Sequence, residues 1–461
     1  MSEQGLAAAR ARMADGGVAA EAIEVFAHFY DQLESGATGM IAESDVDPLP
    51  APSRLADVQI AEEQAREALG ETAIIKLNGG LGTSMGMETA KSLLEVRDGR
   101  TFLDIIAGQV QSLRAKYDVR IPLLFMNSFR TRDDTLAALA KHPDLAVDGL
   151  PLDFLQNREP KLRASDLTPV EWPDDPDLEW CPPGHGDLYT ALSVSGVLRE
   201  LLDAGYKYAS VSNSDNLGAS PDPEVAGWFA SSGAPYAAEV CRRTAADVKG
   251  GYLVVRRSDG RLVLRESAQT PSEDLEQAGD ITRHRYFHTN NLWFDLRALA
   301  ETLDRTGGVL GLPLIRNTKT VDPGRPDSPE VIQIESAMGA AIEVFDGATA
   351  IEVDRSRFLP VKTTNDLLLL RSDVYEISDE YVLSRQVDEL PRVALDPDYY
   401  KLIGGFDQRF AAGAPSLVEA RSLEVNGDWT FGRGVVVRGD VVLEDRGTPS
   451  SVADAAILDP G

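Results

Sequence analysis

Hydrophobic and polar positions divide the chain into stretches with different periodicities. Apolar residues between positions 5 and 35 recur at helical spacing, and Gly36 is expected to end this helix. Prolines among acidic residues in 42–54 indicate a linker or an extended strap, and another helix is expected at about 58–70. The pattern therefore predicts a helical N-terminal extension with a linker over residues 1–55.

Short apolar runs alternate with helical stretches from Thr72 onward. Strands are expected at 73–77, 121–126 and 206–211, and helices at about 101–116, 131–140 and 187–203. This alternation predicts an α/β domain with a parallel sheet covered by helices on both faces. Strand-like runs at 252–256, 261–265 and 286–294 suggest an antiparallel extension, and a helix at 333–345 with a strand at 349–353 completes a domain over 56–375.

The tail, residues 376–461, has a period of six. One apolar column consists of Leu423, Trp429, Val435 and Val441, and a second of Val425, Phe431, Val437 and Leu443. Two such columns are the signature of a hexapeptide-type parallel β-helix, which we expect to be left-handed, and a plain meander of short strands is the alternative. Four hexads bury little alone, so the tail is expected to dock on the main domain or on another subunit.

A glycine-rich loop follows the first strand of this domain. Residues 77–86 read Leu-Asn-Gly-Gly-Leu-Gly-Thr-Ser-Met-Gly and contain no charged side chain. Glycines allow the backbone to approach a ligand closely, and their N–H groups can form an anion-binding nest. The dinucleotide pattern fails because Met85 stands where glycine is required, and the Walker A pattern fails because Lys91 follows Ala90. The loop suits phosphate but matches neither class, and a purely structural turn is the alternative.

Composition excludes several classes of protein. The 461 residues include 45 Lys and Arg against 74 Asp and Glu, a net charge of −29, which argues against a nucleic-acid binder and against docking on an anionic membrane. Two cysteines, Cys181 and Cys241, are too few for a disulfide framework or a four-ligand zinc site. No secretory h-region and no apolar run of membrane-span length is visible, so a soluble cytoplasmic protein is expected.

Several motifs together resemble one enzyme family. The glycine loop with Lys-Ser-Leu-Leu at 91–94 is similar to the nucleotide loop of eukaryotic-type UTP–glucose-1-phosphate uridylyltransferases, the UDP-glucose pyrophosphorylases. Further blocks follow in the family's order: Met-Asn-Ser-Phe (126–129), Pro-Pro-Gly-His-Gly-Asp (182–187), Ser-Asn-Ser-Asp-Asn-Leu-Gly-Ala (212–219), Lys-Gly-Gly (249–251), Thr-Asn-Asn-Leu-Trp (289–293), Val-Ile-Gln-Ile-Glu (331–335) and Arg-Ser-Arg-Phe-Leu-Pro-Val-Lys-Thr-Thr-Asn-Asp-Leu (355–367). Where family members often carry Cys-x-Gly-Pro before the loop lysine, this chain has Met-Glu-Thr-Ala at 87–90.

The resemblance implies a Rossmann-like, GT-A-like nucleotidyltransferase with a mixed sheet flanked by helices. The implied reaction is Mg²⁺-dependent, in-line attack of glucose 1-phosphate on the α-phosphorus of UTP, giving UDP-glucose and pyrophosphate. No enzyme nucleophile is needed, so positioning and charge neutralisation supply the catalysis. The alternatives are a broader UDP-sugar pyrophosphorylase acting on galactose or N-acetylhexosamine 1-phosphate, and a non-catalytic nucleotide-sugar sensor. The tail could mediate a homo-oligomer.

The resemblance also assigns roles to individual residues. Lys91 and Lys362 are expected at the phosphates and Asp215 at Mg²⁺, and His185 is expected to contact the sugar phosphate rather than act as a base. Gln156 is expected at the uracil edge with Gly184 beside it. The remaining expected UTP contacts are Leu77, Gly79, Gly80, Gly82 and Thr83, and the remaining sugar contacts are Asn213, Gly251, Glu266, Asn290 and Asn291. The structural alternatives are a cap after a strand for Asp215 and a turn pair for Asn290 and Asn291.

Overall fold

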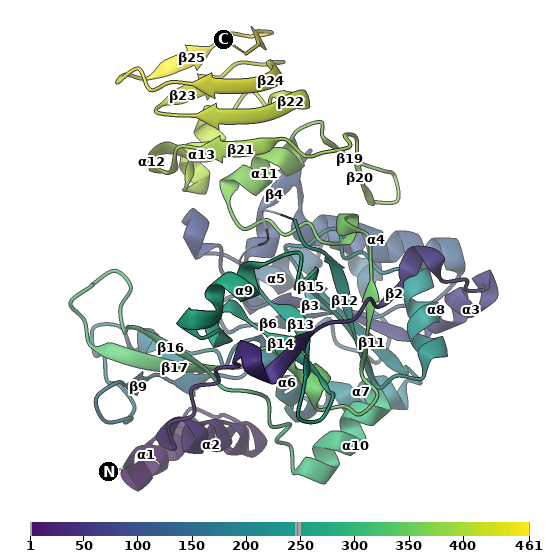
Figure 1. Ribbon diagram of the computed structural model, residues 1–461, viewed down its shortest axis with the longest axis vertical. Helices are drawn as coiled ribbons and strands as arrows, with labels where there is room; N and C mark the ends of the chain where they lie inside the picture. Colours follow the sequence, from purple (N-terminus) through teal and green to yellow (C-terminus); the bar gives the residue numbers. More distant parts are fainter. Residues whose placement is uncertain (1, 245–246, 248–249, 461) are drawn as a thin grey trace.

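The computed structural model describes residues 2–244, 247 and 250–460 (Figure 1). At its centre lies an eight-stranded sheet in the order β2-β18-β12-β15-β11-β3-β6-β7. The strands are β2 (Ser53–Arg54), β18 (Thr349–Glu352), β12 (Tyr236–Arg242), β15 (Tyr286–Asp295), β11 (Tyr208–Asn213), β3 (Thr72–Asn78), β6 (Leu123–Asn127) and β7 (Asp153–Leu155). Only β15 runs antiparallel to its neighbours, so the sheet is mixed, as expected for this α/β domain.

Helices cover both faces of this sheet, and β3 shows why. Its alternate side chains face opposite ways: Ala73 and Ile75 join one apolar core, while Ile74 joins a second. The first core is closed by α6 (Leu188–Val194), α7 (Val197–Asp203) and α10 (Leu296–Thr306). The second is closed by α3 (Glu62–Gly70), α4 (Phe102–Tyr117), α5 (Arg132–Leu139), α8 (Pro223–Ser232) and α11 (Thr364–Arg371). A strand buried on both faces is rich in apolar residues, and the 73–77 segment is apolar except for Lys76. The buried Lys76 ammonium donates to Ser212 Oγ at 2.7 Å and to the Ala219 carbonyl at 2.8 Å.

Two of the expected helices are broken by glycine. The 5–35 segment forms α1 (Ser2–Asp15) and α2 (Ala20–Glu34), separated at Gly17, whose φ is +74°. The 187–203 segment divides into α6 and α7 at Gly196, whose φ is +83°. A left-handed residue cannot continue an α-helix, so both expectations of one uninterrupted helix were wrong. In Figure 1, α1 and α2 lie at the end of the molecule opposite the tail.

The 42–54 segment is an extended strap. Its β1 (Val46–Pro48) pairs antiparallel with β13 (Tyr252–Arg256), which pairs in turn with β14 (Leu262–Arg265), and its β2 pairs with β18 of the central sheet. The antiparallel extension is therefore confirmed for 252–256 and 261–265, whereas 286–294 belongs to the central sheet as β15. Backbone pairing on two sheet edges excludes a free linker here.

The helix expected at 333–345 is wrong. Residues Glu330–Glu335 form β17, which pairs antiparallel with β16 (Ile315–Thr320) and with β9 (Leu162–Arg163). A short 3₁₀ turn, Met338–Glu343, follows it. The run Val-Ile-Gln-Ile is rich in β-branched residues and alternates buried and partly buried positions after Val331, which favours a half-buried strand.

Two further short strand pairs lie outside these sheets. They are β8 (Glu159–Pro160) with β10 (Trp180–Cys181) and β4 (Glu95–Arg97) with β5 (Arg100–Thr101).

The tail strands pair in parallel, as their period of six predicts. One sheet contains β21 (Arg392–Leu395), β22 (Ser416–Val425), β24 (Val436–Leu443) and β26 (Ile457–Leu458), and a second contains β23 (Trp429–Phe431) and β25 (Ser450–Val452). The hairpin β19 (Tyr375–Ile377) and β20 (Leu383–Arg385) and helices α12 (Pro397–Tyr400) and α13 (Ile403–Arg409) precede or interrupt them. Both apolar columns join the core that contains α4 and α11, so the tail docks on the main domain.

The structure shows the state of both cysteines and the character of the helices. Cys181 and Cys241 are free and buried. Within the described ranges, no helix has both the length and the apolar character that crossing a membrane requires.

Candidate active site

The glycine loop and Asp215 follow neighbouring parallel strands. Leu77 at the end of β3 pairs with Asn213 at the end of β11, and the Leu77 carbonyl accepts a hydrogen bond from the Ser214 N–H at 3.1 Å. Asn213 and Leu77 are both half-buried there. The carboxyl ends of parallel strands are where open α/β sheets bind ligands. Two of the predicted segments therefore meet at one edge of the sheet.

The glycine loop folds back on itself. The Lys91 N–H donates to the Gly80 carbonyl at 3.2 Å, and the Gly82 carbonyl accepts from the N–H groups of Met85 and Met87. Gly80 and Thr83 are exposed, and no atom lies within 4 Å of the position a Cβ on Gly80 would take. At Gly82 a Cβ would lie 2.6 Å from Met87 Sδ, so the Met87 side chain packs directly on the glycine backbone. The loop thus presents backbone rather than side chains to the sheet edge.

Lys91 joins three segments. Its Nζ lies 2.7 Å from Asp215 Oδ2 and also donates to the Val361 carbonyl. The Val361 N–H donates to the Asp215 carbonyl at 3.3 Å, and Asn216 forms a β-bridge with Pro360. Both charged side chains are about four-fifths buried, with 17% and 19% exposed. The two residues expected at the triphosphate and at the metal are therefore direct neighbours.

A buried ion pair that sequence reasoning missed supports this junction. Arg357 Nε and Nη2 donate to the two carboxylate oxygens of Glu239 at 2.7 and 2.8 Å, and Trp293 Nε1 adds a third bond at 2.9 Å. Glu239 is fully buried, which raises the pKa of its carboxyl, but Arg357 together with the hydrogen bonds from Trp293 and Asn291 outweighs burial and leaves this pKa below its usual value. Arg357 immediately precedes residues 358–362. Its ion pair with Glu239 therefore anchors the segment that contains Val361 and Lys362.

Asn291 belongs to that supporting network. Its Nδ2 donates to Glu239 Oε2 at 3.0 Å and to the Arg357 carbonyl at 3.2 Å, and its Oδ1 accepts from Asn216 Nδ2 at 3.3 Å. The residue is 2% exposed, so neither end of the amide is left for a sugar. Asn290 differs, because its φ of +59° turns the chain, and its Oδ1 lies 3.0 Å from His288 Nδ1. The expected sugar contact at Asn291 thus does not fit this geometry, whereas Asn290 remains half-buried and accessible.

The two segments expected at uracil are in contact. Gln156 Nε2 donates to the Gly184 carbonyl at 2.9 Å, and a Cβ on Gly79 would lie 2.7 Å from Gln156 Oε1. Gly184 has a φ of +78°, and a Cβ there would lie 2.6 Å from the Ser336 carbonyl. Asp187 strengthens the contact by accepting both the N–H and the Nδ2 of Asn157 at 2.6 and 2.8 Å. Burial raises the pKa of Asp187 to about 7.

His185 is held as a neutral hydrogen-bond donor. The Met338 N–H donates to its Nδ1 at 2.9 Å, which leaves the proton on Nε2. Burial lowers the pKa of His185 to about 4, so the imidazole is neutral near pH 7. A neutral donor of this kind can form a hydrogen bond to a phosphate oxygen. Burial likewise lowers the pKa of the neighbouring His288 to about 4.

The expected sugar contacts outside the strand ends gather around Glu266. A Cβ on Gly251 would lie 2.6 Å from Glu266 Oε1, so the carboxyl packs directly on the glycine backbone. Burial raises the pKa of Glu266, and the positive charge of Lys362 partly offsets this rise. Lys362 is exposed, and its N–H donates to Asp366 Oδ2 at 2.8 Å in the cap of α11. Lys249, in the 249–251 block, lies outside the described residues.

The described carboxylates near this site are too few to bind a metal by themselves, so a metal here would also need ligands from phosphates and water. Among the described residues, no cluster of three or more His, Cys, Asp or Glu side chains could hold a metal ion. Mg²⁺ commonly binds through one or two carboxylates together with substrate phosphates and waters. The single Asp215 carboxylate beside the glycine loop is compatible with that arrangement.

Comparisons with known proteins identify the family. The model of the UTP–glucose-1-phosphate uridylyltransferase family matches residues 23–438, which include the site described above and the first tail strands. The chain belongs to this family. Among relatives of the uridylyltransferase family, the Hordeum vulgare enzyme is 41% identical over 396 residues, covering 85% of this chain and 81% of that protein. The Saccharomyces cerevisiae enzyme is 39% identical over 402 residues, covering 86% and 78%.

Solved structures of the family agree along nearly the whole chain. A structure of the UDP-glucose pyrophosphorylase from Leishmania major matches with a TM-score of 0.92 at 42% identity, covering 99% of this chain and 98% of that one. A variant of the same enzyme, solved in complex with UDP-glucose, matches with the same values. The Trypanosoma brucei protein matches with a TM-score of 0.90 at 40% identity and the same coverage.

Proposed function

We propose that this uridylyltransferase-family protein transfers the uridylyl group of UTP to glucose 1-phosphate, giving UDP-glucose and pyrophosphate in a reversible reaction. The observation that carries the proposal is the meeting of Lys91, Asp215 and the Val361 carbonyl beside the glycine loop. Family membership and the relative that binds UDP-glucose support it. A phosphate oxygen of the sugar attacks the α-phosphorus, the bond from that phosphorus to the β-phosphate bridge breaks, and pyrophosphate leaves with the electron pair.

UTP would lie along the edge where β3 and β11 end. Gln156 and the Gly184 backbone would bind the uracil, since an amide can donate to and accept from the O4/N3 edge. Backbone groups of Leu77, Gly79, Gly80, Gly82 and Thr83 would bind ribose and phosphates. Lys91 would neutralise charge on the triphosphate, because a compact ammonium on a flexible stem can follow a moving phosphate.

We propose Asp215 as the protein ligand of Mg²⁺. The residue holds a carboxylate 2.7 Å from a lysine at the end of a strand, which suits a metal shared with phosphate oxygens. When bound, the ion would supply neutralisation of charge on the phosphates. The protein contributes by holding Asp215 through the Val361 N–H and by placing Lys91 beside it.

Glucose 1-phosphate would occupy the side formed by β11, β15 and the β13–β14 hairpin. His185 Nε2–H and Lys362 would contact its phosphate, while Asn213, Asn290, Glu266 and the Gly251 backbone would contact its hydroxyls. Buried polar groups discriminate between epimers because a wrong hydroxyl leaves them unpaired. We keep Asn291 out of this set, because Glu239, Arg357 and Asn216 use both ends of its amide.

The test is pyrophosphate release from UTP across a panel of sugar 1-phosphates with Mg²⁺. We expect glucose 1-phosphate to be the preferred substrate. Comparable turnover of galactose or N-acetylglucosamine 1-phosphate would favour the broader UDP-sugar pyrophosphorylase. UTP binding without turnover of any sugar phosphate would overturn the proposal in favour of a nucleotide-sugar sensor. Omission of Mg²⁺ tests the metal separately.

We propose in addition a helical extension over 1–55, a catalytic domain over 56–375 and a tail over 376–461. The parallel pairing of β22 with β24 supports a parallel β-helix in the tail, for which we propose the left-handed form. We also propose that the protein self-associates through this tail and that it is located in the cytoplasm. Size-exclusion chromatography with light scattering of the full chain and of a chain without β24–β26 tests self-association.

A further inference from the structure

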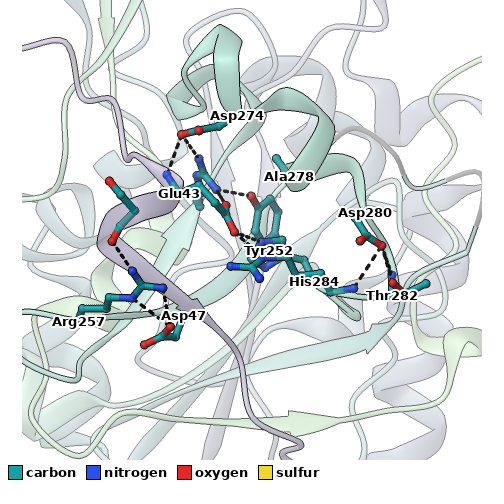
Figure 2. Close-up of polar contacts among 12 residues, drawn as sticks. Glu43, Asp47, Tyr252, Arg257, Asp274, Ala278, Asp280, Thr282 and His284 are labelled. Atoms are coloured by element: carbon teal, nitrogen blue, oxygen red, sulfur yellow. Dashed lines mark hydrogen bonds and ion pairs between the residues drawn. The ribbon is translucent and has the colours of Figure 1, made fainter.

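The N-terminal strap places a buried carboxylate against the β13–β14 hairpin (Figure 2). Glu43 lies just before β1 and is only 7% exposed. Its carboxylate accepts hydrogen bonds from Arg283 Nε at 2.7 Å, from His284 Nε2 at 3.0 Å and from Arg265 Nη1. These donors stand 222 to 241 residues further along the chain. We call Glu43, Arg265, Arg283 and His284 the strap lock.

The charges of the strap lock compensate one another. Burial raises the pKa of the Glu43 carboxyl, but its hydrogen bonds from Arg283, His284 and Arg265 outweigh burial, and this pKa lies below its usual value. Glu43 is therefore ionised at neutral pH. Because a buried charge is tolerated only with charged or hydrogen-bonding partners, loss of the carboxylate would leave the fully buried Arg265 side chain poorly compensated.

Arg265 connects the strap lock to the open end of the hairpin. Its Nη1 also donates to the Tyr252 hydroxyl at 2.9 Å, and its Nη2 lies 3.3 Å from Asp274 Oδ2. Tyr252 is the first residue of β13, Arg265 is the last residue of β14, and the two are cross-strand partners. The strap lock thus holds the open end of the hairpin, where β13 begins and β14 ends.

The residues immediately beyond that point are proposed sugar contacts. Gly251 precedes Tyr252, and Glu266 follows Arg265. The Glu266 carboxyl packs on the Gly251 backbone, and the Gly251 carbonyl accepts the His288 N–H at 3.0 Å. A displacement of Arg265 would therefore move Glu266 directly, and Gly251 with it.

We propose that Glu43 is a positioning residue for the sugar end of the active site, acting through Arg265 on Glu266 and Gly251. The inference rests on the proposed function and extends it to a residue of the N-terminal strap. In the described part of the chain, the side-chain partners of Glu43 are Arg265, Arg283 and His284, and its N–H donates to Asp274. None of these partners belongs to the segments proposed for uracil and the triphosphate, so we expect the effect to be confined to the sugar.

The test uses Glu43→Gln in the full-length chain, which removes the charge and keeps the size of the side chain. Pyrophosphate release is measured while UTP and glucose 1-phosphate are varied in turn. We expect the KM for glucose 1-phosphate to rise roughly 10-fold, since a ~1 Å misplacement of a positioning group can cost up to about 10²-fold in rate. The KM for UTP should change less than about twofold, an effect too small to reflect a lost contact.

The matched control is Asp47→Asn on the same strap. Asp47 pairs with Arg257 at 2.9 Å, but its side chain is 56% exposed, and the pair lies at the other end of the hairpin edge (Figure 2). Exposed pairs contribute little to stability. Both KM values should therefore stay at the wild-type level in this variant.

Two outcomes overturn the proposal. One is a wild-type KM for glucose 1-phosphate in a folded Glu43→Gln protein, and the other is an equal rise of both KM values, which indicates general loosening. If Glu43→Gln does not fold, Asp274→Asn replaces it, and it weakens both the second contact of Arg265 and the hydrogen bond from the Glu43 N–H. A smaller, sugar-selective rise in KM supports the proposal, and an unchanged KM contradicts it.

The wild-type protein in the same assay distinguishes the two levels of the hypothesis. Absence of wild-type turnover overturns the proposed function, and this inference falls with it. Wild-type turnover together with an unaffected Glu43→Gln variant overturns only the role of Glu43.

Discussion

Lys91 Nζ donates to Asp215 Oδ2 across 2.7 Å, so the ammonium proposed for the triphosphate and the carboxylate proposed for the metal neutralise each other. A phosphate that draws Lys91 toward itself would leave Asp215 free for Mg²⁺. Binding of UTP and of the metal should therefore be coupled, with each increasing the affinity of the other by the same factor.

Lys91→Met should separate this coupling from catalysis. We expect turnover to fall by about 10²–10³-fold, the usual effect of removing one preorganised charged donor. Mg²⁺ in the absence of UTP should bind this variant more tightly than the wild type, because Asp215 has lost its cation. Isothermal titration with Mg²⁺ checks this, and Asp215→Asn, which should show no such gain, is the control. Weaker Mg²⁺ binding by Lys91→Met would contradict the coupling.

Glu239→Gln should destabilise the protein strongly. Removing one partner of a buried ion pair typically costs about 3–5 kcal/mol, because the other charge stays buried. Urea unfolding measures the loss. The control is Asp407→Asn. Asp407 pairs with Arg371 at 2.6 Å, and about half of the Asp407 side chain is exposed, so its replacement should cost less than about 1 kcal/mol. Equal losses in the two variants would refute the importance of the buried pair.

Gly184→Ala should raise the KM for UTP and lower stability. The left-handed φ of +78° is strained for alanine, and the new Cβ would lie 2.6 Å from the Ser336 carbonyl, a backbone atom that cannot rotate away. Gly260→Ala is the matched control, since its φ is +74° but no atom lies within 4 Å of the Cβ position. Strain alone costs about 1–3 kcal/mol. An effect at Gly184 no larger than that at Gly260 would show that the contact with Ser336 does not matter.

Acid should weaken the fold partly through His185. Its pKa in the folded protein is about 4, below its ordinary value of 6.5. The unfolded chain therefore binds the proton first, and stability contributed by the neutral imidazole is complete above pH 6.5 and is lost as the pH falls from 6.5 toward 4. His288 acts in the same direction. Thermal melting of His185→Gln should show a shallower decline over this window, and an identical decline would argue against a buried neutral His185.

Sequence motifs suggested those parts of the candidate site that are contiguous in the chain. The glycine loop with Lys91 and the Gly184–His185 turn each lie within a few residues, and the tail hexads were recognised by their spacing in the same way. The supporting charges could not be found in this way. Arg357 meets Glu239 across 118 positions, and Glu43 meets Arg283 across 240, and no local signal connects such partners.

The sequence also could not predict that Asn290 and Asn291 have different roles. The sequence motif led us to expect both asparagines at the sugar, although adjacent side chains in a regular strand face opposite ways. In the structure Asn290 has a positive φ and Asn291 is hydrogen-bonded to Glu239, which is why we propose only Asn290 as a sugar contact. The helix expected at 333–345 failed for a related reason, since β17 is stabilised by pairing with β16, a strand that the sequence pattern did not predict.

The strap has a consequence for how the chain can be shortened. β1 and β2 are strands of three and two residues that close the outer edges of β13 and β18, and β1 ends in Pro48. Very short edge strands and proline are devices by which proteins prevent sheets of different molecules from pairing. A protein trimmed at residue 55 would uncover the longer β13 and β18 as open edges. Its failure would then be intermolecular, as aggregation, rather than a mere loss of two helices.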